Sequence, residues 1–186
     1  MKKHNILKAV FLAIMAMALF TTACQDTEKI EGANKLVDSA NKKSDEAKAL
    51  INKTSESFDK VMKDTADFDE QKKKHEGELK EIVKNYDKIM ELQKGAAKDF
   101  VEAAKLNPND KFKAYYDASA KHSEKLAEMV NQNKQSAQAL LDSSDIESYA
   151  KKIQEIDTKT TALIKEADEI AVTVKKLEQE VNALNK

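Results

Sequence analysis

Apolar side chains recur along this chain at alternating spacings of three and four residues, in four separate runs. Because an α-helix turns once every 3.6 residues, this spacing places them on one stripe of each helix. Neighbouring positions widen the stripes, as expected for helices that face the core of a bundle. No strand pattern follows residue 24, so the sequence predicts an all-α fold. The most regular run comprises Ile146, Tyr149, Ile153, Ile156, Leu163, Ala167, Ile170, Val174, Leu177, Val181 and Leu184.

Three polar segments separate the runs. Residues 69–78 carry no apolar side chain, and we predict a turn there between helices over 30–68 and 79–103. One continuous helix is the alternative, because the heptad phase continues through Lys72 and His75, and Gly77 costs a helix only about 1 kcal/mol. Pro108 ends the second helix, since proline opens a helix but does not continue one. Ser144 and Glu147 have the spacing of a capping box before the fourth helix.

The short connections predict an antiparallel four-helix bundle or coiled coil with long helices, over residues 30–186. The first and fourth runs cover about 39 residues each, whereas the second and third cover only about 25 to 29. At 1.5 Å per residue, the outer helices would extend roughly 15–20 Å beyond the inner ones. We therefore expect a two-helix membrane-proximal stalk, in which Ala33 and Ala40 pack against Val174, Leu177, Val181 and Leu184.

The first 23 residues have the layout of a secretory signal peptide. A basic start over 1–8 precedes an unbroken run of twelve apolar, uncharged residues over 9–20. Twelve helical residues rise only about 18 Å, short of the roughly 30 Å hydrocarbon core of a bilayer. Residues 1–23 are therefore expected to be removed from the mature chain.

The segment Thr21-Thr22-Ala23-Cys24 resembles the lipobox of bacterial lipoproteins, with Thr21 where leucine is most usual. The resemblance implies cleavage before Cys24 and attachment of diacylglyceryl, with acyl chains such as palmitate, to its sulfur. Cys24 is also the only cysteine of the chain, and a leftover thiol is a liability in an oxidising compartment. Two or more acyl chains give a stable anchor. We therefore predict Cys24 as the lipid attachment site and residues 24–29 as a lipidated tether.

The lipoprotein resemblance also implies a location. The protein is expected on the extracytoplasmic side of a membrane, in the cell envelope. Gln25 follows the cysteine, and in Gram-negative lipoproteins a residue other than aspartate there favours the outer membrane.

Composition supports long helices and argues against nucleic-acid binding. Charged residues make up 35% of the chain, with only three glycines and one proline. Every basic residue is lysine, so the chain lacks the arginine fork favoured for phosphate and base recognition. Without residues 1–23, the 32 basic side chains become 29 against 33 acidic ones, a net charge near −4.

The sequence contains no catalytic motif, and we predict neither an enzyme nor a metal or cofactor site. His75 and His122 follow Lys72 and Ser119 by three residues, so neither belongs to the Glu-x-x-His pairs of di-metal bundles. We expect His122 at the edge of an apolar stripe. Polar residues at stripe positions either line a cavity or set the helix register: Ser44, Thr54, Gln93, Ser119, Ser123, Asn133 and Thr160.

These features predict a non-enzymatic, lipid-anchored envelope protein that acts as a structural or binding module. Its expected partners are the membrane and an envelope protein or cell-wall polymer, with no small-molecule substrate. The alternative is a surface-exposed adhesin that binds a host ligand. The terminal Lys186 is shared with the murein lipoprotein, and the Lys-rich helical composition is similar to that of cell-wall-binding lipoproteins; neither likeness identifies a site residue.

Overall fold

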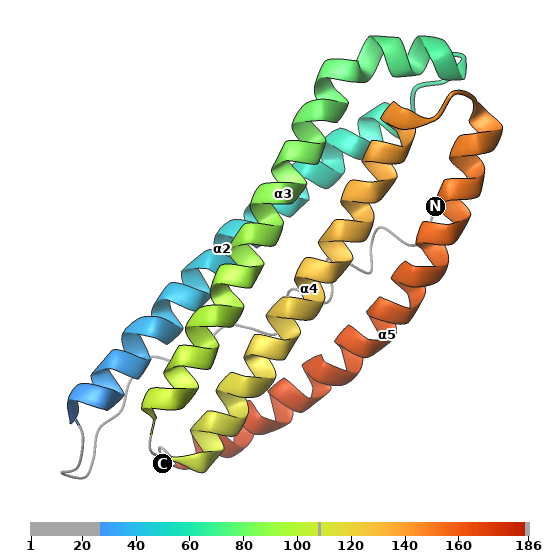
Figure 1. The fold of residues 1–186 in the computed structure, drawn as a ribbon. Coiled ribbons are helices and arrows are strands. Elements are labelled where there is room, and N and C mark those ends of the chain that lie inside the picture. The colour runs from blue at the N-terminus through green and yellow to red at the C-terminus, as the bar shows by residue number, and fades with distance from the viewer. Residues whose placement is uncertain (1–26, 108, 185–186) are drawn as a thin grey trace.

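Four long helices make up the part of the protein that the structure, a computed structural model, describes: residues 27–107 and 109–184. They are α2 (Thr27–Met62), α3 (Phe68–Leu106), α4 (Asp110–Asp142) and α5 (Ile146–Leu184). Successive helices run in opposite directions and pack side by side (Figure 1), and the described residues contain no strand. The predicted all-α antiparallel four-helix bundle is confirmed.

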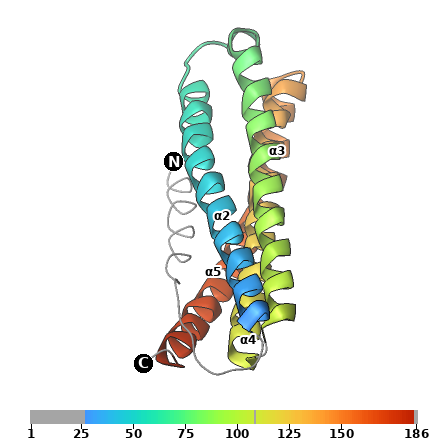
Figure 2. The ribbon, with the colours of Figure 1, turned by 90° about the vertical axis from the view of Figure 1, so that its left-hand side faces the viewer.

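The helices form a series in chain order rather than a closed ring. α3 packs between α2 and α4, and α5 packs on α4. α2 and α5 therefore lie at the two ends of the series, without extensive contact between them, and α5 runs obliquely to the other helices (Figure 2). We call the end with the α2–α3 and α4–α5 connections the tip, and the end where α2 begins the base.

The core consists of two clusters of buried apolar side chains. The tip cluster contains large residues such as Leu79, Tyr86 and Leu140. The base cluster is rich in alanine, which allows close helix approach, and its larger members include Phe100 and Tyr116. The stripe positions predicted from the sequence supply most of both clusters.

The predicted turn over residues 69–78 is wrong, and so is the alternative of one continuous helix. The chain leaves the helix at Lys63–Asp67, and residues 69–78 form the first turns of α3. Their polar side chains have partners that hold them in the helix. Gln71 donates to the carbonyl oxygen of Val61 at 2.6 Å, and Lys72 Nζ donates to that of Ser143 at 2.9 Å.

This shift of the turn removes the reason for a two-helix stalk. With α3 beginning at Phe68, the four helices have 36, 39, 33 and 39 residues. At the base, Ala33 and Val174 share a cluster with Phe100 of α3 and Tyr116 of α4. The base is therefore built by all four helices.

The starts of α2 and α5 differ slightly from the predicted boundaries. α2 begins at Thr27, so residues 27–29, assigned above to the tether, form its first turn. At α5 the capping pair lies one residue later than predicted: Asp145 Oδ1 accepts from the Ser148 amide at 2.8 Å. Ser144 instead donates its hydroxyl to the Asp145 carboxylate at 2.6 Å.

Candidate functional site

The predicted lipid attachment residue, Cys24, lies outside the described residues. The first described residue, Thr27, begins α2 at the base. Within residues 27–107 and 109–184, no helix combines the length and apolar character needed to cross a bilayer.

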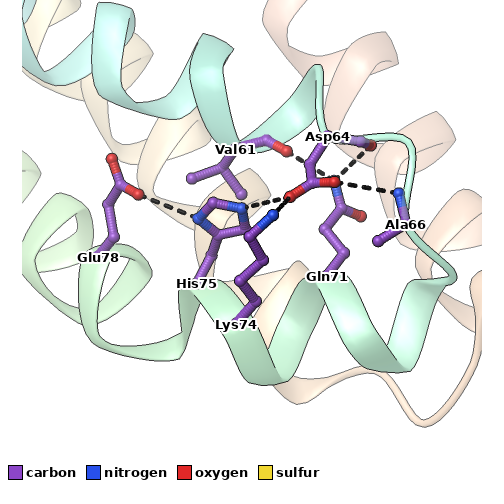
Figure 3. Close-up of polar contacts among 7 residues, drawn as sticks. All are labelled: Val61, Asp64, Ala66, Gln71, Lys74, His75 and Glu78. Carbon is purple, nitrogen blue, oxygen red and sulfur yellow. Dashed lines mark hydrogen bonds and ion pairs between the residues drawn. The ribbon is translucent and has the colours of Figure 1, made fainter.

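At the tip, Asp64 joins the α2–α3 connection to the first turns of α3 (Figure 3). Its Oδ2 accepts from Lys74 Nζ at 2.7 Å and lies 2.8 Å from His75 Nε2, while its Oδ1 accepts from the Ala66 amide at 3.1 Å. The other ring nitrogen of His75, Nδ1, lies 3.1 Å from Glu78 Oε2. We call Asp64, Lys74, His75 and Glu78 the tip network.

The charges of the tip network reinforce one another. Lys74 first, and His75 second, hold the pKa of the Asp64 carboxyl well below its usual range. Asp64 is also the main cause that raises the pKa of His75, with Glu78 adding to it against the effect of burial. A protonated His75 donates both ring N–H groups to carboxylates, so neither nitrogen is open to a ligand. These contacts hold the α2–α3 connection against the first turns of α3.

A groove of about 560 Å³ lies between the first turns of α3 and the end of α4, also at the tip. Its lining mixes both signs of charge around Val83 and Leu141: Asp69, Lys72, Lys73, Glu76, Lys80 and Asp142. Lys73 and Lys74 are exposed and Lys72 is half-buried, and Lys72 and Lys74 make the contacts given above.

The middle of the bundle holds a second unusual set of side chains. Gln93, His122 and Ser123 are completely buried, and Ser44 is 7% exposed. Within the described part of the protein, their side-chain nitrogen and oxygen atoms have no hydrogen-bond partner. In sequence these residues fall between members of the tip cluster and members of the base cluster on α2, α3 and α4. We call these four residues the polar layer.

His122 is therefore more buried than its predicted place at the edge of the stripe. Burial lowers the pKa of His122 to about 4, opposed by the negative charge of Asp168. The imidazole is neutral at pH 7. Burying polar atoms without partners costs free energy, so the polar layer lowers the stability of the bundle.

A small cavity of about 90 Å³ lies in the tip half of the bundle, where α5 faces α2. Asn133 and Thr160, two of the polar stripe residues of the sequence, line it. For these two positions the cavity interpretation is thus supported. Ser44, Gln93 and Ser123 instead belong to the polar layer.

Over residues 27–107 and 109–184, no group of three or more His, Cys, Asp or Glu side chains is placed to hold a metal ion. Sequence reasoning missed Asp64, because only the folded connection brings it to His75, and it also missed Glu78. Glu78 follows His75 by three residues, and that spacing was a usable signal.

Comparison with protein-family models, with curated proteins and with solved structures finds no match for this chain.

Proposed function

We propose that this chain is a non-enzymatic, lipid-anchored protein of the cell envelope that acts as a spacer and presents a binding surface at its tip. One observation carries this proposal. The helix that follows Cys24 in the sequence, α2, begins at the base, and both helix connections of the tip lie at the opposite end. At 1.5 Å per residue, the 36 residues of α2 span about 54 Å.

The construction of the tip supports a role in binding. A spacer alone needs no defined end, but here the α2–α3 connection is held by charged contacts on Asp64. The adjoining groove offers both charged and apolar groups. A partner with mixed charges, such as an envelope protein or a cell-wall polymer, suits such a surface.

Substitution of the anchor residue tests the first part of the proposal. The wild-type chain should fractionate with membranes and incorporate a labelled fatty acid in its native host. Cys24→Ser should abolish labelling and leave the chain in a soluble or unprocessed form. Gln25→Asn is the matched control, because it changes the adjoining residue and keeps the sulfur. Equal labelling of the wild type and Cys24→Ser overturns the anchor.

Site-specific photo-cross-linking tests the second part. A photoreactive residue at position 73 on the tip should capture an envelope component, and one at position 105 near the base should not. Both positions are exposed lysines of α3. Equal capture at the two positions overturns the tip as the binding surface.

The alternative function, an adhesin, predicts display on the cell surface. Protease added to intact cells cleaves a displayed bundle and spares one that faces the periplasm. Cleavage, checked against a periplasmic marker protein that stays intact, favours the adhesin. Full protection excludes it.

A further inference from the structure

α5 is the least buried helix of the bundle. Five of its 39 residues are buried, compared with nine of 36 in α2, 11 of 39 in α3 and 15 of 33 in α4. Two of the five, Tyr149 and Ile156, are still 8% exposed, and a third is the small Ala167. Because hydrophobic stabilisation grows with the apolar area removed from water, fewer strongly stabilising contacts hold α5 than hold the other helices.

The position of α5 allows it to leave without disturbing the packing of the other helices on one another. α5 packs extensively only on α4 and runs obliquely to the rest of the bundle (Figure 2), whereas α3 has a neighbour on each side. α2 also lies at an end of the series, but it packs more extensively on α3 than α5 does on α4. The ion pair of Lys43 with Asp99 and the hydrogen bond from Gln71 to Val61 add to that contact. α5 is therefore the end helix with the weaker attachment.

The polar layer lies beside the middle of α5. Lys125 Nζ, three residues after His122 on α4, lies 2.9 Å from Glu166 Oε2 of α5. Burial lowers the pKa of His122, and the negative charge of Asp168, also on α5, opposes this effect. His122 and Ser123 are completely buried, and their side-chain polar atoms have no partner among the described residues. Opening of α5 lets water reach this side of α4, which removes part of the free-energy cost of burying them.

The tip half of α5 faces the small cavity described above. Ile156 and Thr160 of α5 line it, together with Phe58 of α2. A cavity removes packing partners from the side chains that line it, so the packing of α5 against α2 is incomplete here. The Tyr149 hydroxyl donates to Met62 Sδ of α2 at 3.6 Å, but a thioether is a weak acceptor, so this bond adds little.

We propose that α5 is a releasable helix, which opens from α4 as a unit while α2, α3 and α4 stay folded. The pivot is the α4–α5 connection, residues 143–145. Lys72 of α3 donates to the Ser143 carbonyl oxygen at 2.9 Å, so the end of α4 keeps its place during opening. The open state uncovers the core positions that Tyr149 and Val174 close, and it preserves the length from base to tip, which α2 spans. This property goes beyond the proposed spacer function and requires neither the lipid nor a partner at the tip.

Native-state hydrogen exchange of the full-length chain in detergent, measured by mass spectrometry of its peptides, tests the proposal. Amides in both halves of α5 should exchange at least tenfold faster than those in the middle of α2 and α3, because α5 opens as one unit. Exchange of α5 at the rate of α2 overturns the proposal. Fast exchange confined to the first and last turns of α5 is fraying, and it overturns the proposal as well.

Two valines of α5 provide a matched pair of variants. Val174 is completely buried in the base cluster, whereas Val172 is 70% exposed. Val174→Ala should speed exchange in α5 about tenfold, the effect of removing two buried methyl-sized groups. Val172→Ala should not speed it, because no buried contact is lost. Equal exchange of α5 in the two variants contradicts an opening that breaks the packing of α5.

Two lysines provide a milder pair, for the case in which Val174→Ala alters the fold, which circular dichroism detects. Lys125 pairs with Glu166 of α5, and Lys43 pairs with Asp99 within the rest of the bundle. Lys125→Met should speed exchange in α5 by up to about fivefold, the effect of losing a surface ion pair. Lys43→Met should speed exchange in α2 and leave α5 unchanged. Equal acceleration of α5 by both variants means that α5 opens only with the whole bundle, and overturns the proposal.

Discussion

Lys43 of α2 reaches across to α3 and donates to Asp99 Oδ2 at 2.5 Å. On the way, its aliphatic part crosses Gly95, where an added Cβ would lie 3.3 Å from the Cδ of Lys43. The missing side chain of Gly95 therefore leaves room for the lysine stem of an interhelical ion pair. Gly77, also inside α3, has nothing within 4 Å of an added Cβ.

This contrast between two helical glycines predicts different effects of the same substitution. Gly77→Ala should raise the free energy of unfolding by about 1 kcal/mol, the difference in helix propensity between glycine and alanine. Gly95→Ala should gain less, because Lys43 must move away from the new methyl group. Urea denaturation of both variants measures the two values. A larger gain for Gly95→Ala contradicts the close approach.

The tip network predicts a dependence of stability on pH through His75. Its pKa in the folded protein is raised above the ordinary 6.5, so the stabilisation is fully present below 6.5 and is lost as pH rises through the folded value. Relative to His75→Gln, the wild type should therefore lose stability as pH rises above 6.5. The difference in urea midpoints between the two proteins at each pH measures this effect, and a constant difference contradicts it.

The lowered pKa of Asp64 predicts that the tip network also loses stability at acidic pH. Its folded pKa is depressed, so its contribution is present above the ordinary value of 3.8 and is lost as pH falls through the folded value. Asp64→Asn should destabilise the protein at pH 6 and less so at strongly acidic pH. Asp142→Asn, a change at the other connection, serves as the control in the same urea titrations. An effect of Asp64→Asn that does not shrink with acidification contradicts the assignment.

The sequence predicted the helices well where apolar periodicity decided the structure, and less well where polar contacts did. Residues such as Val174 and Val181 lie in the core as their spacing requires. The α2–α3 connection was predicted at the wrong place, because Gln71 and Lys72 belong to a polar run that is typical of a turn. Both residues lie in α3 instead, where they donate hydrogen bonds to the carbonyl groups of Val61 and Ser143. Such partners lie 10 and 71 residues away, beyond the range of any local pattern.

The candidate sites, too, could be predicted only in part from the sequence. Periodicity placed Gln93 and Asn133 at stripe positions, but it does not distinguish a residue in a closed core from one beside a cavity. That difference depends on where α5 lies relative to α2, which is a property of packing across the whole bundle.

Burial of His122 predicts that mild acid weakens the fold. Its folded pKa of about 4 lies below the ordinary 6.5, so as pH falls below 6.5 the unfolded chain takes up the proton first. Between pH 7.5 and pH 5 this one residue should cost about 2 kcal/mol of stability. The acid-induced loss should shrink by that amount in His122→Leu, measured by urea denaturation at both pH values. The same loss in variant and wild type contradicts a buried neutral imidazole.

The polar layer predicts that removing polarity from the core stabilises the protein. Gln93 is completely buried, and neither Nε2 nor Oε1 has a hydrogen-bond partner in the described part of the chain. An unsatisfied buried polar group costs about 1–3 kcal/mol, so Gln93→Leu, which is similar in size, should raise the free energy of unfolding by an amount of that order. Gln138→Leu is the control, because Gln138 Nε2 donates to the Asp142 carboxylate at the surface and the change should have little effect. If Gln93→Leu destabilises the bundle, the amide of Gln93 has a partner in solution, and the polar layer is then a hydrogen-bonded element of the core.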